Sequence, residues 1–307
     1  MSSILTNTSA MTALQTLRSI NSDISASQQR ISSGLKIGSA KDGAAFYSIA
    51  TTMRSDIKSL ETVDSLLGIG KAKVETARVG TDDIIDATQK IKDLLISAKE
   101  GSADKTLIQT EIKQLQEQIV TTAKASSYNG VNMIYKGATG AGAGIQTITA
   151  SITRDASNNV GTTSIEIDSA NTLLIDGATA ANGILSKDRT GANSGNYSII
   201  GGANNIALTA STTSAQLSDM IEAVDGALKD LTKSSSTLGS ASNRIDQSGE
   251  FAKKLKSALQ SGVSRLVDAD MEEESARLSA LQVRQQLGVQ ALSIANQNSQ
   301  NILSLFR

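Results

Sequence analysis

The sequence predicts a mainly α-helical fold, in which long antiparallel helical rods or a coiled coil, built from the N- and C-terminal segments, accompany a small β-rich central domain. Three observations predict this fold class. Apolar residues recur at intervals of seven in two long stretches, as they do in coiled coils. The 307 residues include no proline and only 2% aromatic residues, which favours long helices packed through aliphatic side chains. A block rich in Gly, Ser, Thr, Asn and Ala separates the two stretches.

The composition excludes the commonest catalytic and metal-binding chemistry. The chain has no His and no Cys, so it lacks Ser-His-Asp and Cys-His nucleophile systems. Typical zinc and iron–sulfur sites and disulfide bonds are excluded for the same reason. We therefore predict no enzymatic activity, no catalytic residue, no cofactor and no metal.

Charge and hydropathy narrow the range of partners. The chain has 29 Lys and Arg against 30 Asp and Glu, a formal net charge of −1, which gives no general attraction to nucleic acid or to an anionic membrane. It contains no run of roughly 18 apolar residues that would cross a bilayer. The first residues lack the basic and apolar regions of a secretory signal peptide, so we expect no cleaved leader.

The first rod is predicted over residues 53–98. Apolar residues follow Met53 at heptad spacing over successive turns, and such a helix would be roughly 70 Å long. Gly68 and Gly70 lower the helix propensity in its middle, which allows a bend there. The positions that we assign to its coiled-coil seam are Leu60, Leu67, Val74, Ile84 and Ile91.

A shorter helix is predicted after the first rod. Its apolar residues have helical spacing and end before the turn signal Asn129-Gly130. They are Ile108, Ile112, Leu115 and Ile119.

The second rod is predicted in the C-terminal part of the chain, and Val224 is assigned to its seam. Residues at heptad spacing include Leu217, Val224, Leu231, Leu238, Ile245, Ala252, Leu259 and Leu266. A seam of this length needs a partner of comparable length. The partner is either the first rod of the same chain, which we favour, or another copy of the chain.

The two ends have a different pattern. Residues 11–35 carry a narrow apolar stripe on a helix that is otherwise rich in Ser, Thr and Gln. The C-terminal helix has two stripes: one comprises Leu278, Leu281, Leu292 and Ala295, and the other Val283, Leu287, Ala291, Ile294 and Ile302. A helix that is apolar on two faces needs neighbours on both.

The central block is predicted to be β-rich. Short β-branched runs at 145–152, 164–168, 197–200 and 206–209 lie between Gly and Asn turn signals. A flexible linker is the alternative. The glycine run 137–144 does not match a dinucleotide-binding motif, and the acidic run 268–274 is typical of a helix start rather than of a calcium loop.

Several motifs resemble those of one protein family. The run from Ile31 to Ala45, ISSGLKIGSAKDGAA, resembles the N-terminal signature of bacterial flagellins. The run 292–307, which closes with LSLFR, resembles the flagellin C-terminus. The segments around 264–270 and 128–131 are also similar to the family. The sequence departs from the family's pattern at Gly43, Phe46-Tyr47 and Ser299. Taken together, the motifs extend the resemblance over about residues 1–136 and 214–307.

This resemblance implies an extracellular subunit that self-assembles into the bacterial flagellar filament for motility. It implies inner filament-core helices at 1–40 and 270–307, an outer-wall rod at 41–136 and 214–269, and a variable surface domain at 137–213. The residues expected to pack in the filament are Leu14, Leu17, Ile20, Ile24, Leu281, Leu287, Leu292, Ile302, Leu305 and Phe306.

The resemblance also implies partners. They are further copies of the chain in a helical filament, other flagellins, an export chaperone of the flagellar type III system, and the filament cap and hook-junction proteins. In similar flagellins a mammalian Toll-like receptor contacts a basic, a leucine and an acidic side chain, which match Lys90, Leu94 and Gln118. Lys90 cannot make the bidentate bonds of Arg, and Gln118 has no carboxylate, so weak recognition is expected.

The sequence leaves other functions open. A hook–filament junction protein would share the helical ends. A surface adhesin or receptor-binding module would use the central block on a helical stalk, and an enzyme would need a catalytic set that the sequence does not show. The plant-recognised stretch of flagellins matches Gln29–Ala50, where Gly43 and Phe46 depart from the usual residues.

Overall fold

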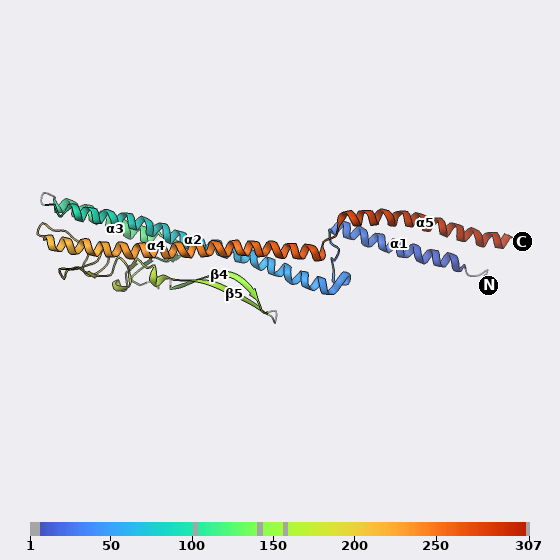
Figure 1. Ribbon diagram of the computed structural model, residues 1–307, viewed down its shortest axis with the longest axis horizontal. Coiled ribbons are helices and arrows are strands. Elements are labelled where there is room, and N and C mark those ends of the chain that lie inside the picture. The colour runs from blue at the N-terminus through green and yellow to red at the C-terminus, as the bar shows by residue number, and fades with distance from the viewer. Residues whose placement is uncertain (1–6, 101–103, 140–143, 156–158, 305–307) are drawn as a thin grey trace. The chain divides into compact units, whose positions relative to one another are not determined.

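The structure is a computed structural model that describes residues 7–100, 104–139, 144–155 and 159–304, without the side chains of 298–304. Within these ranges it is mainly helical, as predicted (Figure 1). The helices are α1 (Thr8–Ser33), α2 (Ala40–Ser97), α3 (Lys105–Ala125), α4 (Ser214–Val267) and α5 (Met271–Ser304).

The strands form four two-stranded sheets in the described part of the chain. The longest is the antiparallel hairpin of β4 (Ile145–Arg154) and β5 (Val160–Asp168), in which Ile148 lies opposite Ile165. The short strands are β1 (Ser127–Tyr128), β2 (Val131–Asn132), β3 (Tyr135–Lys136), β6 (Ile175–Asp176), β7 (Arg189–Thr190) and β8 (Asn196–Tyr197). β1 pairs with β2 and β7 with β8 in antiparallel fashion, whereas β3 and β6 are parallel.

The chain divides into two compact units. The first contains residues 1–58 and 256–307, and the second contains residues 59–255. The first unit thus combines an N-terminal with a C-terminal segment, whereas the second is one continuous segment. The predicted division at 40/41, 136/137, 213/214 and 269/270 stays a prediction.

In the second unit, α2 and α4 run antiparallel with one fixed register. Their polar contacts are Lys71 with Asp246, Asp82 with Ser235, Lys92 with Asp225, and Lys99 with Ser218. As the residue number rises along α2, the number of its partner falls by the same amount along α4. The rods therefore pair within one chain, the alternative that the sequence favours.

The seam of this rod is buried. Leu60, Leu67, Val74, Ile84, Ile91 and Val224 are each no more than 3% exposed. Two threonines of α2, Thr81 and Thr88, are also buried in it, and their hydroxyls donate to the carbonyls of Ala77 and Ile84 one turn earlier. This pairing satisfies the hydroxyls without a partner across the seam. At the rim, Lys229 and Lys92 lower the pKa of Asp225 to about 2.

Gly68 and Gly70 do not bend α2. Its non-helical residue is Gly43, with φ 168° and ψ 89°. Gly70 instead lies under the β4–β5 hairpin, because a Cβ there would come within 2.6 Å of Ile148 Cγ2. No atom lies within 4 Å of a Cβ built on Gly68. The absent side chain at 70 thus permits a close approach between helix and hairpin.

Replacing Gly70 with Ala should destabilise the second unit, whereas the same change at Gly68 should stabilise it. Ala at 70 overpacks the contact with Ile148, which typically costs about 1–3 kcal/mol. At 68 the gain in helix propensity, roughly 0.5–1 kcal/mol, has no opposing clash. Denaturant unfolding of the two variants measures the difference; equal stabilities would show that the hairpin does not rest on Gly70.

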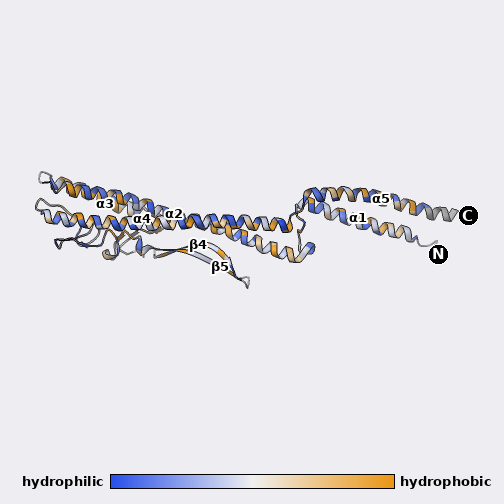
Figure 2. Cartoon of the chain, viewed as in Figure 1, coloured by the Kyte–Doolittle hydropathy of each residue, from blue (hydrophilic) through white to orange (hydrophobic). Residues whose placement is uncertain are grey.

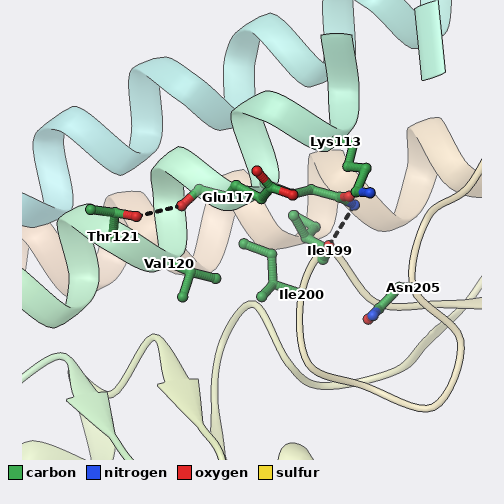
Figure 3. A pocket seen from close by; sticks show the side chains of 8 residues that line it. Lys113, Glu117, Val120, Thr121, Ile199, Ile200 and Asn205 are labelled. Atoms are coloured by element: carbon green, nitrogen blue, oxygen red, sulfur yellow. Dashed lines mark hydrogen bonds between the residues drawn. The ribbon is translucent and has the colours of Figure 1, made fainter. Parts of the chain in front are cut away.

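The central block is β-rich in one part and irregular in another. The runs 145–152 and 164–168 form strands, as predicted, and the structure pairs them as the β4–β5 hairpin; of 197–200 only Tyr197 lies in a strand, and 206–209 forms none. Side chains of α3 take the place of a strand partner. The Gln116 amide donates to the carbonyl of Ile199 (Figure 3). It also donates to the carbonyl of Ile206, and the Gln109 carbonyl accepts from Leu208 N.

The central block shares one core with the rod. Ile148 and Ile165 of the hairpin and Ile206 of the irregular part belong to the same buried cluster as Val74 and Leu231. A buried carboxylate also holds a loop of the block against the rod: Asp219 of α4 accepts hydrogen bonds from the N–H groups of Asn193 and Gly195. The block is therefore packed against the helices rather than attached as a flexible linker.

In the first unit, α1 and α5 pack side by side. The connectors beside them form a short antiparallel bridge: Lys36 N donates to Val267 O at 2.7 Å, and Ala269 N donates to Gly34 O at 2.9 Å. Gly34 ends α1 with φ +70°, a conformation that favours glycine. The acidic run starts a helix as predicted, because Asp270 caps α5 by accepting from Glu272 N and Glu273 N.

Candidate assembly surface

The inner face of α5 is closed by α1. Gly288 lies against Leu17 and Ile20, with a Cβ position 3.5 Å from Leu17 Cδ1. The Gln285 amide donates to Asn21 Oδ1 at 2.6 Å, and the Asn7 amide donates to the carbonyl of Ala295 at 3.0 Å. These α5 residues follow one another at helical spacing, so a single stripe of α5 contacts α1 along its length.

A buried carboxylate fixes this pair of helices. Glu274 is 6% exposed, accepts from the Arg30 guanidinium at 3.0 Å and lies within 3.2 Å of the Ser27 hydroxyl, which is itself buried. The hydrogen bond from Arg30 lowers the pKa of Glu274, more strongly than burial raises it. The sequence suggested only a favourable helix start here. It did not show that Ser27 and Arg30 donate hydrogen bonds to the Glu274 carboxylate, because these two residues lie in a distant segment.

Replacing Glu274 with Gln should loosen the α1–α5 pair by about 1–3 kcal/mol, because a charge-assisted hydrogen bond is lost and Arg30 keeps no equivalent partner. The folded pKa is lowered, so the stabilisation is complete above the ordinary value of 4.5 and is lost as the pH falls through the folded value. Amide hydrogen exchange of α1 and α5 at neutral and acidic pH measures both effects. Faster exchange in the variant only at neutral pH is the expected signature; equal exchange at both would contradict it.

The opposite face of α5 has no partner among the residues that the structure describes. Its apolar residues, the outward stripe, are Val283, Leu287 and Ile294, which are 55%, 58% and 60% exposed. On α1, Met11 and Leu14 are 66% and 40% exposed. Figure 2 shows that hydrophobic and hydrophilic residues alternate along both helices. The second apolar stripe of α5 thus remains available to another molecule.

The residues expected to pack in a filament fall into three groups. Leu14 and Leu287 are exposed. Leu17, Ile20, Ile24, Leu281 and Leu292 are half-buried or buried on the faces where α1 and α5 meet. The side chain of Ile302, and residues Leu305 and Phe306, lie outside what the structure describes.

A groove between α1 and α5 adds to this surface. It has a volume of about 520 Å³, and small side chains line it: Ser9, Thr12, Ala13, Thr16, Gly288, Ala291 and Ala295. Small residues let large apolar side chains of a neighbouring helix approach closely. In the sequence, these residues are recognisable only as small residues between the larger apolar side chains of the two helices.

Two further depressions lie in the second unit. One, of about 400 Å³, brings together Lys90, Leu94 and Gln118, the three positions matched to a receptor contact, with Asp93 and Glu111 beside them. The other, of about 480 Å³, lies between α3 and the loop of Ile199 and Ile200, with Lys113 and Glu117 at its edge (Figure 3).

The described residues show no arrangement for metal chemistry or for spanning a membrane. Across 7–100, 104–139, 144–155 and 159–304, no three His, Cys, Asp or Glu residues are grouped to hold a metal ion. Within the same ranges no helix combines the length and hydropathy of a membrane span. The surface that stands out is the paired helices with a second, exposed apolar face.

Long paired helices, one of which keeps an apolar face that no described residue covers, are typical of a structural subunit that packs against copies of itself. Comparison with known proteins agrees. Residues 4–139 match the bacterial flagellin N-terminal helical region, and residues 221–306 match the bacterial flagellin C-terminal helical region. The chain belongs to the bacterial flagellin family.

Full-length relatives support this assignment. Flagellin C of Rhizobium meliloti strain 1021 is 44% identical over 322 residues, and flagellin of Brucella melitensis biotype 1 is 40% identical over 308, each covering 100% of both chains. Flagellin A of Rhizobium meliloti is 39% identical over an alignment of 396 residues, longer than this chain, so that relative has segments this one lacks.

The family fixes the general function. The chain is a structural subunit that self-assembles with other flagellins into the extracellular filament of the bacterial flagellum and serves motility. A hook–filament junction protein is not favoured, because the relatives matched over their whole length are flagellins.

Proposed function

We propose that subunits join in the filament through the outward stripe of α5, the exposed end of α1 and the groove between the two helices. The observation that carries this proposal is the exposure of Val283, Leu287 and Ile294 on a helix whose other stripe is already covered by α1. Burial of such side chains gains roughly 25 cal/mol per Å² of apolar surface. Repeated along a helical polymer, this gain favours assembly over the free subunit.

The same proposal assigns layers to the filament. The helices at 1–40 and 270–307 form its inner core, and the rod at 41–136 and 214–269 forms the outer wall. Residues 137–213 form the outer surface. Support comes from the exposed apolar stripe of α5 and the exposed Met11 and Leu14 of α1, and from the ion pairs along the α2–α4 rod, although α2 also exposes apolar side chains such as Leu66 and Ile69.

We further propose that the chain leaves the cell through the flagellar type III system without a cleaved signal peptide. An export chaperone would hold it before export, and the filament cap and hook-junction proteins would receive it. Family membership supports these steps, as does the absence of Cys from the sequence, because an unfolded chain then carries no disulfide through a channel. No catalytic role is proposed.

Replacing Leu287 with Asp should abolish polymerisation and leave the rod folded. A carboxylate buried against apolar side chains without a partner is strongly unfavourable. Leu287 is 58% exposed in the free chain, so its charge there remains in water. Sedimentation and electron microscopy after salting-out measure the filament yield, and circular dichroism checks the helices.

Two control variants separate position from charge. Leu287→Met keeps an apolar side chain at the same place and should assemble normally. Gln282→Asp adds a charge on another side of α5, and we expect a smaller loss of yield. Normal filaments from Leu287→Asp would refute the proposed packing.

We also propose weak recognition by the mammalian Toll-like flagellin receptor. Lys90 and Gln118 are exposed and line one depression with the half-buried Leu94, which supports a common contact surface. The ammonium of Lys90 makes one point contact where a guanidinium makes two bonds, and Gln118 has no charge to pair.

Combining Lys90→Arg with Gln118→Glu should raise receptor signalling by about tenfold or more, since each restored charge-assisted contact is worth on the order of 1.5–3 kcal/mol. A reporter-cell assay with the free subunit measures it. Lys113→Arg, also on α3 but lining the other depression, is the matched control and should change nothing. Strong signalling by the unmodified subunit would contradict the expectation.

A further inference from the structure

The methionines of the chain differ widely in the exposure of their side chains. Met11 on α1 is 66% exposed, and Met271 at the start of α5 is 44% exposed. Met133 and Met220, in the core of the second unit, are 2% and 3% exposed. Peroxides oxidise accessible thioethers first, so the structure ranks Met11 as the most reactive of these four.

Met11 also has a particular place on α1. The residues that face α5 are Ala13, Leu17, Ile20 and Ile24, at helical spacing. Met11 lies on a different side of the helix, with Leu14 one turn further along and also exposed. It therefore contributes to the surface that another subunit covers, and not to the contact within the chain.

We propose that Met11 is an oxidation site that controls entry of the subunit into the filament. A peroxide transfers one oxygen atom to the thioether sulfur of the free subunit, which yields methionine sulfoxide and water. The sulfoxide excludes the subunit from assembly. This inference rests on the proposed packing through α1 and α5.

The physical reason is the polarity of the new group. Sulfoxidation turns a flexible apolar side chain into a polar one. Against an apolar neighbour its S=O oxygen would lose water without gaining a donor, which is unfavourable. In the free subunit the oxygen stays hydrated, so α1 and α5 remain paired.

The test uses the full chain before assembly. The protein is treated with hydrogen peroxide until about half of Met11 is oxidised, peroxide is removed, and polymerisation is induced by salting-out. Peptide mass spectrometry then measures the sulfoxide at each methionine in the pellet and the supernatant. We expect Met11 sulfoxide to be depleted about tenfold in the pellet. Equal fractions in pellet and supernatant would overturn the proposal.

Two variants make the result specific. Met11→Leu keeps size and polarity and should polymerise fully after the same treatment. Met271→Leu removes the other thioether that is exposed among the described residues and should stay as sensitive as the unmodified chain. If oxidised Met11→Leu loses assembly, or if Met271→Leu protects it, Met11 is not the controlling site.

The outcome is separable from that of the proposed function. Normal filaments from Leu287→Asp refute the packing itself. If Leu287→Asp blocks assembly while Met11 sulfoxide enters the pellet freely, the packing stands and only the role of Met11 is wrong.

Discussion

The antiparallel contact between α2 and α4 is the constraint on which the rest of the molecule depends. Neither helix buries its apolar face alone, and a shift of one helix along the other would move the seam side chains away from the positions into which they pack. Polar pairs such as Lys71–Asp246 and Lys92–Asp225 lie beside the seam and agree on one register. With the register fixed, the two ends of a long chain are brought to the same place, although nearly the whole sequence separates them.

The remaining surface of the rod determines how the central block folds. α3 adds a third helix, and the hairpin of β4 and β5 rests on α2 where Gly70 offers no side chain. Elsewhere the block has apolar residues such as Ile206 but no strand to pair with. Gln109 and Gln116 of α3 form hydrogen bonds with this segment, and isolated backbone bonds such as Ile206 N to Ser198 O add to them without forming a regular sheet. This irregular segment is held in place because side chains of α3 accept and donate hydrogen bonds that a neighbouring strand would otherwise provide.

The α1–α5 pair differs from the rod because only half of its apolar surface is used within the chain. Glu274, held by Ser27 and Arg30, fixes the position of the two helices at one end. Further along, α5 has Gly288 against α1 and Leu287 toward solvent, one residue apart in sequence and on different faces. In the packing that we propose, this exposed face is the surface that another subunit covers. A charge at Leu287 or oxidation at Met11 would then act on assembly rather than on the fold of the free chain.

The sequence by itself determined the helices, the β character of 145–152 and 164–168 and the two-faced character of α5, because these depend on the pattern of residues along one element. It also indicated the family through local motifs. It could not determine that Gly70 serves close packing rather than a bend, that 206–209 forms no strand, or that Leu292 faces α1 while Leu287 does not. Those outcomes depend on which segment, distant in sequence, lies opposite each residue. The spacing of apolar residues defines how many apolar faces a helix has. Only the tertiary structure decides which of these faces are covered by other segments of the same chain.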